Sequence, residues 1–146
     1  MKNLPLDLEL FETVLMYNAL FDQAYLETII HYTKPTFFKN KNIKSVFGSV
    51  ISYYMEHNKI PNITELKTHL VDQDKRDCLR EVILSFKTID KNYDKDVLLK
   101  NTERFIKEKS VLNTVLKTSL DIQTGIIDPS KILKALPKGF STPELN

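Results

Sequence analysis

The stretch KNIKSVFGSVISYYMEH, residues 41–57, has the clearest hydrophobic periodicity in the chain. Its apolar residues recur at spacings of three and four: Ile43, Val46, Phe47, Val50, Ile51 and Tyr54. This spacing is typical of an α-helix with one wide face against a hydrophobic core. Asn58 follows directly and is a residue type that tolerates the left-handed conformation at a helix end. The sequence therefore predicts a core helix from Lys41 to His57, ended by Asn58.

The same periodicity predicts six further helices on either side of this one. They are expected at about Asp7–Ala19, Asp22–His31, Asn62–Leu70, Lys75–Lys87, Asp94–Thr124 and Asp128–Leu136. Local signals support several of them: Asn62 with Glu65 three residues later is a capping-box pattern, and Asp128-Pro129 fits the start of a helix. The chain has only three glycines, fewer than the turns of a sheet protein of this size usually need. We predict an all-α fold of about seven helices.

The sixth predicted helix differs from the others. It contains no proline or glycine between Asp94 and Thr124, so it would be about 45 Å long at 1.5 Å per residue. Its apolar residues are separated by polar stretches at 100–104 and 107–110. This pattern favours a projecting hairpin, formed with the last helix, that pairs with another subunit. A long surface helix with a narrow core stripe explains it equally well. The hairpin interpretation divides the single domain, residues 1–146, into a small helical head (1–90) and a helical hairpin (94–136).

Composition points to a soluble cytoplasmic protein. The net charge of +2 is the difference between 21 basic and 19 acidic residues, too small to predict a strongly basic nucleic-acid surface or a membrane-binding one. The single cysteine, Cys78, suits a reducing compartment. Asp7 and Glu9 interrupt the amino-terminal stretch where a signal peptide would need its apolar run, and no apolar run approaches the roughly 20 residues of a membrane span.

The search for catalytic, cofactor and metal sites gives no candidate. The chain lacks the phosphate-binding pattern G-x-x-x-x-G-K-[ST], so we expect no ATP hydrolysis by this chain, no cofactor and no catalytic residue. The soft metal ligands are His31, His57, His69 and Cys78. Their separations of 26, 12 and 9 residues match no zinc motif, and none lies beside another on a predicted helix face. We therefore expect no metal site.

Two clusters are candidates for binding. The segment 34–44 mixes aromatic and basic residues, a combination found where proteins contact single-stranded nucleic acid; its candidates are Phe37, Lys39, Lys41 and Lys44. The alternative is that one phenylalanine anchors the loop in the core and the lysines are only solvated. The second cluster is a candidate interface for a second copy or another partner on the predicted hairpin: Phe105, Leu112, Leu116 and Ile132.

Three stretches carry a resemblance to a known family. They are Thr13–Tyr25, which ends in Phe-Asp-Gln-Ala-Tyr; Phe38 followed by Val46-Phe47; and Ile60-Pro61 followed by Ile63 and Leu66. Together they resemble the N-terminal domain of DnaB-type replicative DNA helicases, above all those of T-even phages. The stretch Glu103–Leu120 is a looser match to the long hairpin helix of these domains. Ile43 departs from the bacterial pattern, because many bacterial relatives have histidine there.

The resemblance implies an assembly role rather than a catalytic one. Such domains pair through their hairpins into dimers, three of which form a collar on a hexameric ring, and the collar docks primase and sometimes a helicase loader. ATP and Mg²⁺ would belong to a RecA-like motor with 5′–3′ helicase activity, which this chain does not contain; the chain ends near where the linker to a motor would begin. Two other functions stay open: a standalone phage protein that binds the host replication machinery, and a helical module that binds single-stranded nucleic acid.

Overall fold

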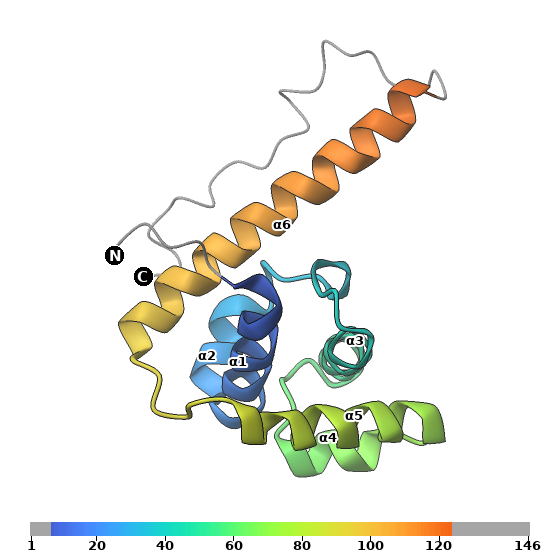
Figure 1. Cartoon of the computed structure of the whole chain (residues 1–146). Coiled ribbons are helices and arrows are strands. Elements are labelled where there is room, and N and C mark those ends of the chain that lie inside the picture. The colour runs from blue at the N-terminus through green and yellow to red at the C-terminus, as the bar shows by residue number, and fades with distance from the viewer. Residues whose placement is uncertain (1–6, 124–146) are drawn as a thin grey trace. The chain divides into compact units, whose positions relative to one another are not determined.

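Helices make up all the regular secondary structure of residues 7–123, the part of the chain described by the computed structural model (Figure 1). The elements in order are α1 (Leu8–Phe21), α2 (Gln23–Ile29), the 3₁₀ turn η1 (Pro35–Phe37), α3 (Lys41–His57), α4 (Ile63–His69), α5 (Gln73–Ser85), the 3₁₀ turn η2 (Phe86–Thr88) and α6 (Lys95–Gln123). The predicted all-α fold is confirmed. The predicted last helix at Asp128–Leu136 lies outside the described residues. The chain divides into two units, Met1–Asp94 and Lys95–Asn146, and each is described by itself.

Short polar side chains set the helix boundaries of the first unit. The Asp22 carboxylate accepts from the Tyr25 N–H at 3.2 Å and begins α2. Asn62 and Glu65 form the predicted capping box, with the Glu65 N–H donating to Asn62 Oδ1 at 2.8 Å and the Asn62 N–H donating to Glu65 Oε1 at 2.9 Å. That second hydrogen bond, followed by one from Lys59, lowers the pKa of Glu65. Asn58 has φ 56° and ends α3 in the left-handed conformation, as predicted.

Helix α3 is the centre of the first unit. It contacts α1, η1, α4 and α5, and Figure 1 shows it nearly end-on beside α1 and above α5. Its buried apolar residues are Ile43, Val46, Phe47, Val50 and Tyr53. The bounds Lys41–His57 are those predicted, but the buried face differs near the C-terminal end. Tyr53 is buried there, whereas the predicted core residues Ile51 and Tyr54 are only partly buried, and Tyr54 packs edge-on against His31.

A buried carboxylate ties α1 to the start of α3. Glu12 is 1% exposed, and its two oxygens accept from the backbone N–H groups of Lys39 and Asn40 at 2.8 and 3.0 Å. Asn40 in turn caps α3, since its side-chain oxygen accepts from the N–H groups of Asn42 and Ile43 at 2.9 and 3.1 Å. Glu12 therefore fixes the backbone from which the central helix begins.

The second unit is described as one helix, α6. Its 29 residues correspond to a length of about 43 Å at 1.5 Å per residue. The buried residues Leu98, Thr102, Phe105, Ile106 and Ser110 recur at spacings of three and four and so share one face. Val97, Val111 and Leu112 are exposed, and the side chains beyond Thr114 are outside the description. Within residues 7–123, no helix combines the length and apolarity that crossing a membrane requires.

The position of Phe47 gives a first test of the fold. Phe47 is fully buried and packs against Phe38 at a ring-centroid distance of 5.3 Å. We expect Phe47→Ala to lower the free energy of unfolding by about 3–5 kcal/mol, because it removes buried contacts and leaves a cavity. Urea denaturation measures the change. The matched control is Met55→Ala on the same helix, where the side chain is 79% exposed and the change should be within about 0.5 kcal/mol. A loss below about 1 kcal/mol for Phe47→Ala would contradict the assigned packing.

The Glu12 contact gives a second test. Glu12→Ala leaves two backbone donors without their acceptor, and a hydrogen bond to a charged group is worth about 1.5–3 kcal/mol, so we expect a loss of at least about 2 kcal/mol in the free energy of unfolding. Glu12→Gln keeps one acceptor oxygen and should be intermediate. Glu9→Gln, on the exposed side of the same helix, removes only the solvent-exposed ion pair with Lys39 and should cost less than about 1 kcal/mol. Equal effects of the Glu12 and Glu9 variants would show that the buried contact does not hold the loop.

Candidate functional site

The aromatic half of the predicted nucleic-acid site is buried. Phe37 is 3% exposed and lies in η1, which contacts α3, and Phe38 is 1% exposed against Phe47. Two consecutive phenylalanines thus anchor the loop 34–40 to the core, as the alternative interpretation proposed for one of them. Stacking of a base needs an exposed ring face, so the candidate Phe37 is corrected to a core residue in this structure.

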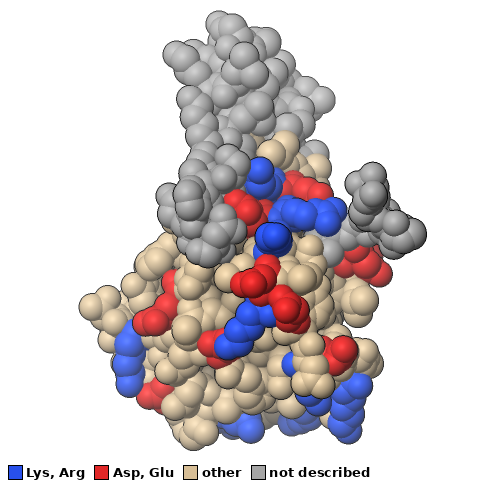
Figure 2. Space-filling model, turned by 90° about the vertical axis from the view of Figure 1, so that its left-hand side faces the viewer, with Lys and Arg blue, Asp and Glu red and all other residues tan. Residues whose placement is uncertain are grey.

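The three lysines of that cluster are exposed. The ammonium of Lys39 donates to Glu9 Oε2 at 3.0 Å, and this hydrogen bond, followed by the attraction of the two charges, raises the pKa of Lys39. Lys41 and Lys44 lie in the first turns of α3, where the helix dipole already carries positive partial charge. Figure 2 shows basic side chains interspersed with acidic ones on the face it presents rather than gathered in one basic surface. Lys39 is thus paired with an acid, whereas the positive end of the helix dipole adds to the charges of Lys41 and Lys44.

The four predicted interface residues of the hairpin do not share one environment: one is buried, one is half exposed, and the side chains of the other two are outside the described part of the chain. Phe105, predicted as an interface residue, is fully buried, and the ammonium of Lys109 lies 5.9 Å from the centroid of its ring. Leu112 is 49% exposed. The side chain of Leu116 and all of Ile132 lie outside the described residues. Leu112 follows Phe105 by one heptad and therefore lies on nearly the same face of α6. The apolar stripe of this helix is thus buried at Phe105 and uncovered at Leu112.

Sequence reasoning missed Val111, which precedes Leu112 and is 43% exposed. The signal was available, since Val111-Leu112 follows the polar stretch 107–110 as an uninterrupted apolar pair. The two residues together make a small apolar surface on α6, which we call the Val111–Leu112 patch.

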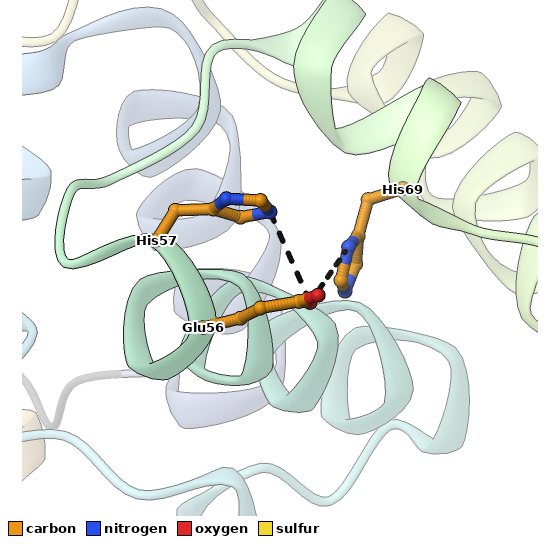
Figure 3. A group of neighbouring side chains, drawn as sticks. All are labelled: Glu56, His57 and His69. Atoms are coloured by element: carbon orange, nitrogen blue, oxygen red, sulfur yellow. Dashed lines mark ion pairs between the residues drawn. The ribbon is translucent and has the colours of Figure 1, made fainter.

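A second omission concerns metal ligands. Glu56, His57 and His69 offer ligand atoms that all lie within 4.8 Å of one another, a grouping that the sequence did not predict (Figure 3). The expectation of no metal site considered sequence spacing and single helix faces. In the structure, His57 and His69 are the last residues of α3 and α4, and the link at 58–62 folds one helix end against the other.

Comparison with known proteins gives one informative similarity. No protein-family model matches the chain. Over 135 residues, the chain is 24% identical to a DnaB-like replicative helicase of Enterobacteria phage T4. The chain is distantly related to this helicase. The similarity covers 90% of the chain but only 28% of the T4 protein, so the chain spans little more than a quarter of that relative's length. It confirms the resemblance found in the sequence. The described fold is all-α, as that resemblance implies.

The exposed lysines give a test of the nucleic-acid interpretation. We expect the chain to show no saturable binding to a fluorescently labelled single-stranded oligonucleotide, measured by anisotropy across a salt titration. Lys41→Gln with Lys44→Gln should leave the signal unchanged, as should the control Lys75→Gln. Binding that weakens steeply with salt and is lost only in the Lys41 and Lys44 variants would instead indicate phosphate contacts at the start of α3.

Proposed function

We propose that this chain is the N-terminal assembly domain of a phage replicative DNA helicase and supports formation of a hexamer at the replication fork. The observation that carries the proposal is the similarity to the T4 DnaB-like replicative helicase over 90% of the chain. The all-α fold is compatible with it, since the likeness in sequence lies in packing motifs such as Phe38 with Val46-Phe47. The contribution of this domain is contact between proteins.

The proposal assigns chemistry and assembly to different parts of the helicase. Hydrolysis of ATP needs a loop whose backbone N–H groups hold the phosphates and whose lysine reaches them, and the pattern for that loop does not occur in these 146 residues. ATP, Mg²⁺ and 5′–3′ translocation would therefore belong to a motor domain elsewhere in the helicase. No residue of this chain is proposed to be catalytic.

Self-association is proposed to use the second unit. The stripe on α6 is buried at Phe105 and becomes exposed at Leu112, where the neighbouring Val111 widens it. Identical apolar patches are most simply hidden by pairing two copies around a two-fold axis. Heptad-related positions suit this arrangement because two long helices can pack along such a seam. Three such dimers would complete a hexameric collar.

Primase, and in some systems a helicase loader, are the proposed partners of the collar. The first unit offers a groove of suitable character on α4 and α5. It is lined by three apolar residues, Leu79, Ile83 and Leu84, and three basic ones, Lys67, Arg76 and Arg80, of which Arg80 also pairs with Asp77 at 3.3 Å. An amphipathic segment with acidic side chains would match both properties, since its apolar face would contact the leucines and Ile83 and its acids would meet the basic residues.

The Val111–Leu112 patch gives the test of this function. We expect the wild-type chain to be at least dimeric at high micromolar concentration in sedimentation equilibrium. Leu112→Lys should shift it to monomer, because pairing would then bury two unpaired charges. Val71→Lys is the matched control: Val71 is 85% exposed and lies in the other unit, so its variant should still associate.

Circular dichroism separates this outcome from unfolding, because Leu112 is half exposed and its substitution should keep the helical signal. A wild-type chain that remains monomeric at these concentrations would contradict the proposed pairing. Association that survives Leu112→Lys would also contradict the use of this patch.

A further inference from the structure

Two imidazoles and a carboxylate converge where α3 and α4 end (Figure 3). Glu56 Oε2 lies 3.8 Å from His57 Nε2 and 3.6 Å from His69 Nδ1. Figure 3 shows the three side chains pointing toward one another, with the carboxylate between the two rings. Glu56 and His57 are consecutive, and neighbouring residues on a helix do not normally face each other. They approach here because His57 is the last residue of α3.

The link between α3 and α4 positions this cluster. Asn58 turns the chain in the left-handed conformation, and the capping box of Asn62 and Glu65 begins α4 after the buried Pro61. This link brings His69 back to the end of α3. Its path depends on local geometry rather than on the histidines themselves, so the cluster is positioned before any ligand arrives.

Tyr53 supports both imidazoles. It is 7% exposed, and its ring centroid lies 4.3 Å from that of His57 and 5.3 Å from that of His69, the latter in an edge-on arrangement. A buried ring that packs against two histidines restricts their orientations, which is the kind of support that metal ligands usually receive.

The distances suit an ion better than direct hydrogen bonds. An N–H···O hydrogen bond spans about 2.7–3.2 Å, and both contacts to Glu56 are longer. A tetrahedral zinc ion binds nitrogen and oxygen at about 2.0–2.2 Å, which places two ligand atoms on the same ion about 3.3 Å apart. The two carboxylate–imidazole distances exceed this value by a few tenths of an ångström, and the three ligand atoms all lie within 4.8 Å of one another. Side-chain rotations of His57 and Glu56, both substantially exposed, can close the remainder.

We propose that Glu56, His57 and His69 form a binding site for a divalent transition-metal ion, Zn²⁺ in particular. Two imidazole nitrogens and one carboxylate oxygen are a ligand set that favours zinc over magnesium or calcium, which prefer oxygen alone. Three protein ligands leave the fourth tetrahedral position to water, and the exposure of His57 and Glu56 gives that position access to solvent. The bound ion links the ends of α3 and α4 and closes the 58–62 link into a ring.

Calorimetric titration of the untagged chain with zinc chloride tests the site. We expect one Zn²⁺ per chain, and at least tenfold weaker binding in each of His57→Ala, His69→Ala and Glu56→Gln. The matched controls are His31→Ala and Cys78→Ser, which remove the remaining histidine and the thiol and should leave affinity unchanged. All three ligand side chains are at least partly exposed, so circular dichroism should show folded variants.

Two further readouts distinguish a site from loose association. Co²⁺ in the same position should give the visible absorption of a low-coordinate ion, and His69→Ala should abolish it. Zn²⁺ should raise the melting temperature of the wild-type chain but not that of His57→Ala, since the ion stabilises only a folded site. Zinc binding that persists in the His57→Ala, His69→Ala double variant, binding lost in Cys78→Ser, or no saturable binding at all would overturn the proposal and leave the three residues as an ion-pair cluster.

Discussion

The fold of the first unit depends on one buried carboxylate. Glu12 accepts two backbone hydrogen bonds from Lys39 and Asn40, residues 27 and 28 positions later in the chain. The segment between α2 and α3 has little regular structure to satisfy its own N–H groups, and buried donors without acceptors are costly. A buried carboxylate is costlier still when unpaired. Each group thus requires the other, and the result is a single position for Asn40, the cap of the helix that contacts α1, α4 and α5.

Local signals in the sequence predict the first unit well, and long-range contacts explain what they miss. The bounds of α3, the left-handed Asn58 and the capping box at Asn62 all follow from residues within one helical turn. Glu12 could not be assigned in this way, because an acid in the first turns of a helix equally suits the helix dipole. The sequence does not group His57 with His69 for a related reason: no zinc motif has their spacing, and their proximity depends on how the 58–62 link folds.

For the candidate interfaces too, the sequence pattern identifies the residues, but only the tertiary packing shows which of them are exposed. The mixture of aromatic and basic residues at 37–44 was compatible with binding or with anchoring, and only the packing of η1 on α3 places both phenylalanines in the core. On α6, periodicity identifies an apolar stripe but not where the stripe is covered. Phe105 and Leu112 are equivalent by heptad position and opposite in exposure. The distant similarity to the T4 helicase supports a role in replication while leaving the assignment of surfaces to the geometry.

The uninterrupted course of α6 has a mechanical consequence. Sharp bends in helices occur at proline, at small-residue pairs or at bulges, and residues 95–123 contain neither proline nor glycine. The helix therefore resists bending as a stiff rod does, and it has no internal hinge. Lys95 and Leu112 therefore lie on one continuous, stiff segment.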